Sequence, residues 1–286
     1  MPETDEIFDA GRALAQKGLF LSRELLPLMG PITQFGEWSA DQKRTIAYLL
    51  AATARAAESG FLLCAYTQIW DAEMVTRSVL EGSLKFCFML QKRDTFEPRF
   101  REYSELLFDI HRAKDHQKAL DLVHASPDPA DPNLQPIRDR LLDEDELARI
   151  RSVPNVERRA LEMKWGFTGL AGELARSGDP MFRGVLGFGH AYSIASHLQH
   201  MDYIGASLPM DRDLRSQDRK AAIHMAHAAR VATDLLHFMY LRMATGYRFV
   251  GCDRGPLRAV DQRIKSFSAE YEHLAQAWMN IEYGAE

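Results

Sequence analysis

The sequence predicts an all-α protein, and three observations support that prediction. Apolar residues recur three and four positions apart through nearly every segment, as on the buried face of an amphipathic helix. No segment shows the sustained alternation of apolar and polar residues that marks a half-buried strand. The segments are separated by helix caps and helix stops. We expect about seven to nine helices, mostly packed as an antiparallel bundle, in a single domain over residues 1–286.

Composition agrees with a globular protein that builds a sizeable core. The chain is 46% hydrophobic and 26% charged. Its net charge of −5 disfavours electrostatic binding to nucleic acid or to an anionic membrane over a broad surface. The three cysteines lack CxxC spacing, so neither a disulfide framework nor a zinc knuckle is expected. Without a signal-peptide core or an apolar run of about 20 residues, the sequence predicts a cytoplasmic protein with no membrane segment.

The first half of the chain predicts four helical stretches. Gly30-Pro31 stops the first of them. Ser39 and Gln42 have capping-box spacing and start the second, in which Ser59-Gly60 marks either a break or a close contact. The third is apolar on several sides, as a central helix would be, and the fourth is more charged. The four stretches cover residues 3–29, 39–57, 61–91 and 97–123.

A proline-rich segment follows these four stretches and precedes the remaining predicted helices. Residues 126–136 hold four prolines in eleven positions. Because proline removes backbone donors and blocks helix, this segment is a candidate linker and the best candidate domain boundary. One later helix starts after Asp179-Pro180 and contains residues 187–205. The other later helices are expected over residues 141–151, 155–164, 170–176, 217–245 and from 256 onward.

The last helix has the cleanest apolar pattern in the chain. Such a pattern is typical of a bundle or coiled-coil seam. Burial within the same chain is the first interpretation, and a homodimer interface is the alternative, because a terminal helix is easily offered to a second copy. The residues of the seam are Leu257, Val260, Ile264, Phe267, Tyr271, Leu274, Trp278 and Ile281.

Three charged residues fall inside an apolar helix face in the third stretch. Glu73, Arg77 and Glu81 are four residues apart and therefore share one face. That face also carries Trp70 and Leu84. Burying an unpaired ion costs several kcal/mol. The pattern therefore indicates either a salt-bridge network that holds two helices in register or a functional site.

A second polar stripe lies in residues 187–205. Tyr192, Ser196 and His200 are four residues apart on the predicted helix. A histidine among hydroxyl side chains suits acid–base chemistry near neutral pH. His190 and His197 share a side with apolar residues, and we expect them in the core.

The segments MVTRSVLEGSLKF and YSIASHLQH resemble a bacterial helical family of unknown function. That family carries R-x-x-x-E on one helix and Y-x-x-x-S-x-x-x-H on a later one, usually with a tryptophan between them. The resemblance covers roughly residues 66–205. It implies that the two polar clusters meet in one site, and it implies no reaction. Family members tend to carry arginine after the tyrosine, where this chain has Ser193. The matching positions are Arg77, Glu81, Trp165, Tyr192, Ser196 and His200.

A third constellation lies on the helix expected over residues 217–245. His227, Arg230, Asp234 and His237 share one face, and Arg219 projects the same way. Six residues separate Arg230 from His237, which fits the R-x(4–6)-H pattern of HEPN-type ribonucleases. These are also helical bundles, and the resemblance implies that arginine and histidine bind the scissile phosphate and move protons.

No metal or cofactor is expected. The histidine pairs at positions 197 and 200 and at 224 and 227 point about 60° apart within each pair. The sequence also lacks HExxH and Walker motifs.

These patterns lead to two hypotheses, and the sequence leaves open whether the protein is an enzyme. In the first it is a metal-independent, HEPN-like ribonuclease in stress response or phage defence. Arg77 then holds a phosphate, Glu81 orients Arg77, and His200 or His237 is the acid–base. In the second, the same pocket belongs to a non-catalytic sensor that binds a small anionic ligand or a partner protein. The residues expected to line the site are Tyr192, Ser196, Trp165 and Arg230.

Overall fold

The computed structural model describes residues 4–284, with side chains from residue 9. It is 83% helical and has no strand in the described range, which confirms the all-α prediction. That range contains twelve α-helices of six residues or more, above the expected seven to nine. The excess arises because expected helices are divided by short turns. Residue 3, the expected start of the first helix, lies outside the described residues.

Two compact units make up the structure, and each is described by itself. The first comprises residues 1–92 and 171–286, and the second comprises residues 93–170. The proline-rich segment 126–136 lies inside the second unit and is largely exposed. It contains a short 3-10 helix over Pro132–Leu134, which Asp131 caps.

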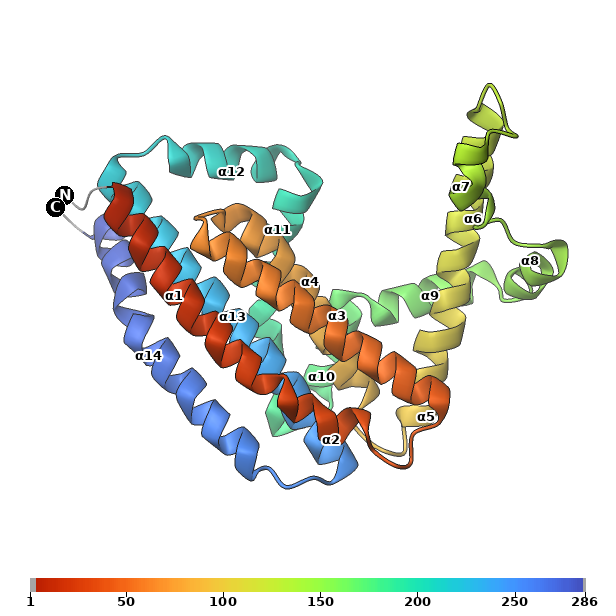
Figure 1. The fold of residues 1–286 in the computed structure, drawn as a ribbon, viewed down its shortest axis with the longest axis horizontal. Helices are drawn as coiled ribbons and strands as arrows, with labels where there is room; N and C mark the ends of the chain where they lie inside the picture. Colours follow the sequence, from red (N-terminus) through yellow and green to blue (C-terminus); the bar gives the residue numbers. More distant parts are fainter. Residues whose placement is uncertain (1–3, 285–286) are drawn as a thin grey trace. The chain divides into compact units, whose positions relative to one another are not determined.

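Five long helices form the bundle of the first unit (Figure 1). Ser22 of α1 contacts Met239 of α13, and Gly11 lies beside Met225, so α1 and α13 run in the same direction. Contacts of Gly60 with Leu235 and of Leu50 with Arg242 give α3 the opposite direction to α13. Helices adjacent in sequence are therefore antiparallel, whereas α1 and α4 both run parallel to α13. The five are α1 (Thr4–Leu25), α3 (Ala40–Ala65), α4 (Ile69–Met89), α13 (Gln217–Val250) and α14 (Gly255–Tyr283).

Local sequence explains where these helices begin and end. Ser39 and Gln42 form the expected capping box at the start of α3. That helix continues through Ser59-Gly60, where a Cβ on Gly60 would lie 2.7 Å from Leu235, so the glycine permits a close contact. Helix α1 ends at Leu25, earlier than expected, because Pro27 cannot donate to the helical ladder. A 3-10 turn (Pro27–Met29) and α2 (Gly30–Thr33) follow.

The apolar seam of α14 is buried over only part of its length. Leu257, Val260, Ile264 and Phe267 are in the core, in agreement with burial inside the same chain. Toward the C-terminal end the seam becomes half-exposed, and Ile281 is exposed. Among the described helices, α3 is the one whose length and composition would allow it to cross a membrane. It packs against α1, α4 and α13.

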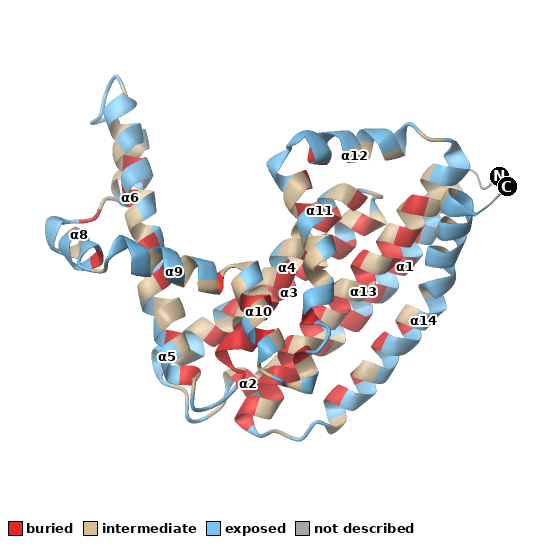
Figure 2. Cartoon of the chain, turned by 180° about the vertical axis from the view of Figure 1, so that it is seen from behind, coloured by how far each residue is buried: buried red, intermediate tan, exposed pale blue. Residues whose placement is uncertain are grey.

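The expected helix over residues 180–205 is interrupted twice. Two 3-10 turns, Pro180–Phe182 and Val185–Phe188, precede α11 (Gly189–His200). Met201 then adopts a left-handed conformation with φ of 48°, and Asp202 caps α12 (Tyr203–Asp213). Helix α12 is mostly exposed, with Gly205 its buried residue (Figure 2).

The second unit is built around one nearly continuous helical rod. The expected helix over residues 97–123 is divided by a single π-helical turn at Glu102–Leu106. The rod consists of α5 (Phe96–Arg101) and α6 (Leu107–Ala125) on either side of that turn. The remaining helices are short and more exposed than the bundle (Figure 2): α7 (Gln135–Arg138), α8 (Glu144–Arg151) and α9 (Asn155–Trp165). Helix α10 (Phe167–Arg176) contains residues of both units.

Gly205→Ala tests the packing of α12 on α11. The new Cβ would lie 1.9 Å from the carbonyl oxygen of His197, a backbone atom that cannot rotate away. We expect a loss of about 1–3 kcal/mol in the free energy of unfolding, measured by urea denaturation, and faster proteolysis between residues 189 and 213. Gly187→Ala is the matched control, because its Cβ would meet nothing within 4 Å. Equal stability of both variants would contradict this packing.

Candidate functional site

The charged face of α4 is divided between two neighbouring helices. Glu73 points toward α13, where it meets Arg230 and His227. Arg77 and Glu81 point toward α11, where they meet Tyr192. One helix face therefore supports two polar clusters within the first unit.

The α4–α11 cluster consists of Arg77, Glu81, Tyr192 and Gln199. Arg77 donates to the Tyr192 hydroxyl at 2.9 Å and to the amide oxygen of Gln199. The Tyr192 hydroxyl donates to Glu81 at 2.8 Å, and Arg77 Nε lies 3.2 Å from the same carboxylate. The guanidinium also lies over the tyrosine ring, 4.6 Å from its centroid.

The members of this cluster bond mainly to one another. The Arg77 side chain is 14% exposed, and all three of its nitrogens lie beside protein oxygens. Burial raises the pKa of Tyr192, and its hydrogen bonds to Arg77 and Glu81 act in opposite directions. Because so little of Arg77 is exposed, an anion has limited access to the guanidinium. The arrangement holds α11 on α4.

The structure brings together Arg77, Glu81 and Tyr192, as expected, but places Gln199 beside them where His200 was expected. Seven residues return a helix to within about 20° of the starting direction, whereas eight residues overshoot it by about 80°. Gln199 therefore lies on the side of α11 that carries Tyr192 and contacts Arg77, whereas His200 points in another direction; both Gln199 and His200 are exposed. Ser196 is half-buried and has no hydrogen bond to Arg77 or Glu81 within the described part of the chain.

The two histidines expected in the core lie elsewhere. His190 is exposed, and His197 is half-exposed with its Nδ1 2.6 Å from Asp202. Asp202 also accepts from the backbone N–H of Gly205, so the pair lies at the junction of α11 and α12. Those interactions hold the pKa of the Asp202 carboxyl below its usual value, the hydrogen bond from His197 foremost.

Trp165 belongs to the second unit. Its indole is buried and donates to Glu102 at 2.9 Å, and the same carboxylate accepts from Lys164 at 2.7 Å. Tyr103 packs against the ring, with centroids 5.3 Å apart. Since Glu102 begins the π-helical turn, Trp165 and Lys164 satisfy a carboxylate where the helical ladder changes.

The α4–α13 cluster consists of Glu73, His227, Arg230 and Asp234. Glu73 is 2% exposed and accepts from Arg230 and from His227 Nδ1, the latter at 3.1 Å. Arg230 also donates to Asp234 at 2.9 Å. A buried carboxylate with a paired guanidinium and a second donor is compensated, so this cluster fixes the register of α4 against α13.

His227 is neutral near pH 7 in this environment. Burial lowers its pKa to about 4, and the nearby charge of Arg212 acts in the same direction. The contact with Glu73 fits a neutral imidazole that donates from Nδ1, because Arg230 already compensates that carboxylate. Trp70 and Trp278 flank the ring, with centroids 5.5 and 5.8 Å away.

His237 lies on the same face of α13 as Arg230, two turns further along. It is half-buried and has no hydrogen-bond partner among the described residues. Burial lowers its pKa below 6.5, while Asp261 and Lys265 of α14 act in opposite directions. Arg230 keeps 37% of its side chain exposed. An arginine and an available neutral histidine therefore share one helix face.

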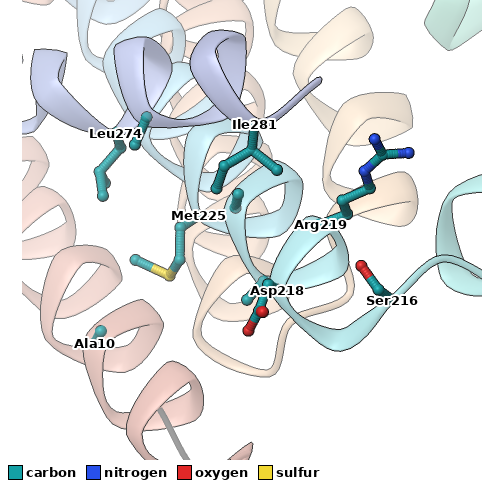
Figure 3. Close-up of a pocket in the computed structure, with 10 residues that line it drawn as sticks. Ala10, Ser216, Asp218, Arg219, Met225, Leu274 and Ile281 are labelled. Carbon is teal, nitrogen blue, oxygen red and sulfur yellow. The ribbon is translucent and has the colours of Figure 1, made fainter. Parts of the chain in front are cut away.

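Arg219, the other basic residue of this face, lines a separate groove. The groove has a volume of about 720 Å³ and lies between the starts of α1 and α13 and the end of α14 (Figure 3). Its lining is mainly apolar and includes Met225, Leu274 and Ile281. Neither polar cluster of α4 contributes to it. Arg219 is about 16 Å from Arg230 along the helix axis, too far to share a small ligand.

Two residues with notable contacts or burial were not predicted from the sequence. The first is Gln199, whose seven-residue spacing from Tyr192 was the available signal. The second is Arg242, which interrupts an apolar stretch of α13 and is fully buried. Across residues 9–284 no group of three His, Cys, Asp or Glu side chains is placed to hold a metal ion.

Comparisons with protein-family models, with curated proteins and with solved structures found no match to this chain.

Tyr192→Phe tests whether the α4–α11 cluster stabilises the fold. The change removes two hydrogen bonds to charged groups and leaves Arg77 and Glu81 part-buried. We expect a loss of about 1–2 kcal/mol in the free energy of unfolding by urea denaturation. Tyr203→Phe is the control, because that side chain is 87% exposed and should change stability by less than about 0.5 kcal/mol. If Tyr192→Phe leaves the free energy of unfolding unchanged, the cluster does not stabilise the fold.

The pH dependence of stability tests the environment of His227. Its folded-state pKa lies below the unfolded value, so below pH 6.5 the unfolded chain binds the proton more strongly. Stability should therefore fall as the pH drops from 6.5 to about 4, by about 2–3 kcal/mol from this residue. His227→Gln, which still offers a donor to Glu73, should flatten this part of the curve. The exposed control His200→Gln should leave the curve unchanged.

Proposed function

We propose that the protein is a metal-independent ribonuclease whose site is centred on Arg230 and His237. The observation that carries this proposal is the placement of these residues on one face of α13, with Arg230 part-exposed and His237 half-buried. Arg230 uses two of its five N–H groups on Glu73 and Asp234, which leaves three for a phosphate oxygen. His237 is neutral near pH 7 and is not engaged by another described residue.

These groups support a specific chemical step. His237 removes the proton of a ribose 2′-hydroxyl, whose oxygen then attacks the adjacent phosphorus. The bond from phosphorus to the 5′-oxygen breaks, and that oxygen takes a proton from solvent. Arg230 stabilises the charge on the non-bridging oxygens through charge-assisted hydrogen bonds. Glu73 and Asp234 orient the guanidinium without touching the substrate.

In this proposal the α4–α11 cluster holds α11 on α4 and does not bind the substrate. Arg77 pairs with Glu81, donates to Tyr192 and Gln199 and keeps only 14% of its side chain exposed, which favours a structural part over phosphate binding. His200 lies on the exposed side of α11. Of the two acid–base candidates, His200 and His237, we therefore choose His237, and Glu81 remains the residue that orients Arg77.

Cleavage of a labelled single-stranded RNA in the presence of a chelator tests the proposal. We expect cleavage of RNA and none of the 2′-deoxy analogue. His237→Asn should lower kcat/KM by about 10²–10⁴-fold with unfolding unchanged, and the rate should fall with acid at a midpoint below pH 6.5. The matched control His200→Asn, on exposed α11, should retain activity.

Two outcomes would contradict this function. Full activity in His237→Asn would remove the proposed base, and loss of activity in His200→Asn would return the role to α11. If the pure protein cleaves no RNA but phosphorylated metabolites raise its Tm, the sensor hypothesis replaces the enzyme.

A further inference from the structure

Arg242 of α13 is the largest fully buried side chain of the described structure, with 0% exposure. Its Nη1 donates to the backbone carbonyl of Leu50 on α3 at 3.3 Å. Its Nε and Nη2 atoms are buried and have no hydrogen-bond partner. No ion pair links the guanidinium to a carboxylate of the described chain.

The other arginines that anchor the first unit are compensated. Arg230 pairs with Glu73, Arg212 with Glu282 at 3.1 Å, and Arg248 with Asp179 at 2.6 Å. Arg242 differs from all three, because it is more deeply buried and has no counter-charge. A buried ion without a partner costs several kcal/mol. A cationic group in this position therefore requires an acceptor that protein side chains do not supply.

The neighbouring groups add donors and no negative charge. Burial lowers the pKa of Arg242 to about 10, so the guanidinium stays charged near pH 7. Burial raises the pKa of the Cys87 thiol to about 12, so Cys87 on α4 is neutral there. The Thr53 hydroxyl donates to the backbone carbonyls of Leu49 and Leu50, at 2.6 and 3.2 Å, so it neither balances the charge of Arg242 nor accepts from it in place of an anion.

We propose that Arg242 binds a small monovalent inorganic anion of the halide class in the core of the first unit. Its donors are Nε–H and Nη2–H of Arg242. One negative charge balances one guanidinium. The complete burial of Arg242 favours a small ion over a phosphate or an organic anion.

Thermal unfolding in chloride and in gluconate at equal ionic strength tests this site, with bromide as a heavier probe. Wild-type protein should gain at least about 3 °C in Tm in chloride or bromide over gluconate. Arg242→Met, which keeps length and removes the charge, should abolish that gain. Arg44→Met is the control and should retain it, because Arg44 is exposed and paired with Asp41. Crystals of wild-type protein grown in bromide should show anomalous density beside the guanidinium.

Equal Tm in all three anions and no bromide density beside Arg242 would overturn the proposal and assign water as the acceptor. A halide gain that persists in Arg242→Met would also overturn it. If Arg242→Met fails to fold, the wild-type anion series and the bromide density decide. Since RNA cleavage rests on Arg230 and His237, either result leaves the proposed function intact.

Discussion

The carboxylate of Glu73 lies in the core of the bundle, where it must be met by donors from another helix. Arg230 and His227 of α13 meet it, so α4 and α13 can pack in only one register. That register also determines which side chains of α4 are placed to contact α11. One and two helical turns further, Arg77 and Glu81 contact α11 through Tyr192 and Gln199.

Two kinds of packing therefore meet on α4. Against α13 the carboxylate of Glu73 is almost fully buried, and Arg230 and His227 compensate it there. Against α11 few residues are buried, and polar contacts hold the helix instead. The α11–α12 segment is consequently less well buried than the bundle and depends on a part-exposed cluster, which makes it the more easily displaced part of the first unit.

Charge pairing also distinguishes the arginines that hold helices together from those that could bind a ligand. Arg77, Arg212 and Arg248 are occupied by protein acceptors, so they anchor helices. Arg230 is both anchored and part-exposed, and His237 beside it has no partner among the described residues. Arg242 is buried without a carboxylate. The proposed chemistry and the proposed anion site both rest on these departures from full pairing.

Apolar periodicity and capping residues by themselves determined the helical class, the capping box of α3 and the shared face of Glu73, Arg77 and Glu81, because these depend on contacts within one helix. The family resemblance implied the meeting of Arg77, Glu81 and Tyr192, and their hydrogen bonds join them. Only the tertiary structure decided that Gln199 joins them while His200 faces outward, because a stripe of four-residue steps drifts by about 40° per step. The break at Met201 and the missing counter-charge of Arg242 likewise depend on which helices are neighbours in space, which local sequence does not encode.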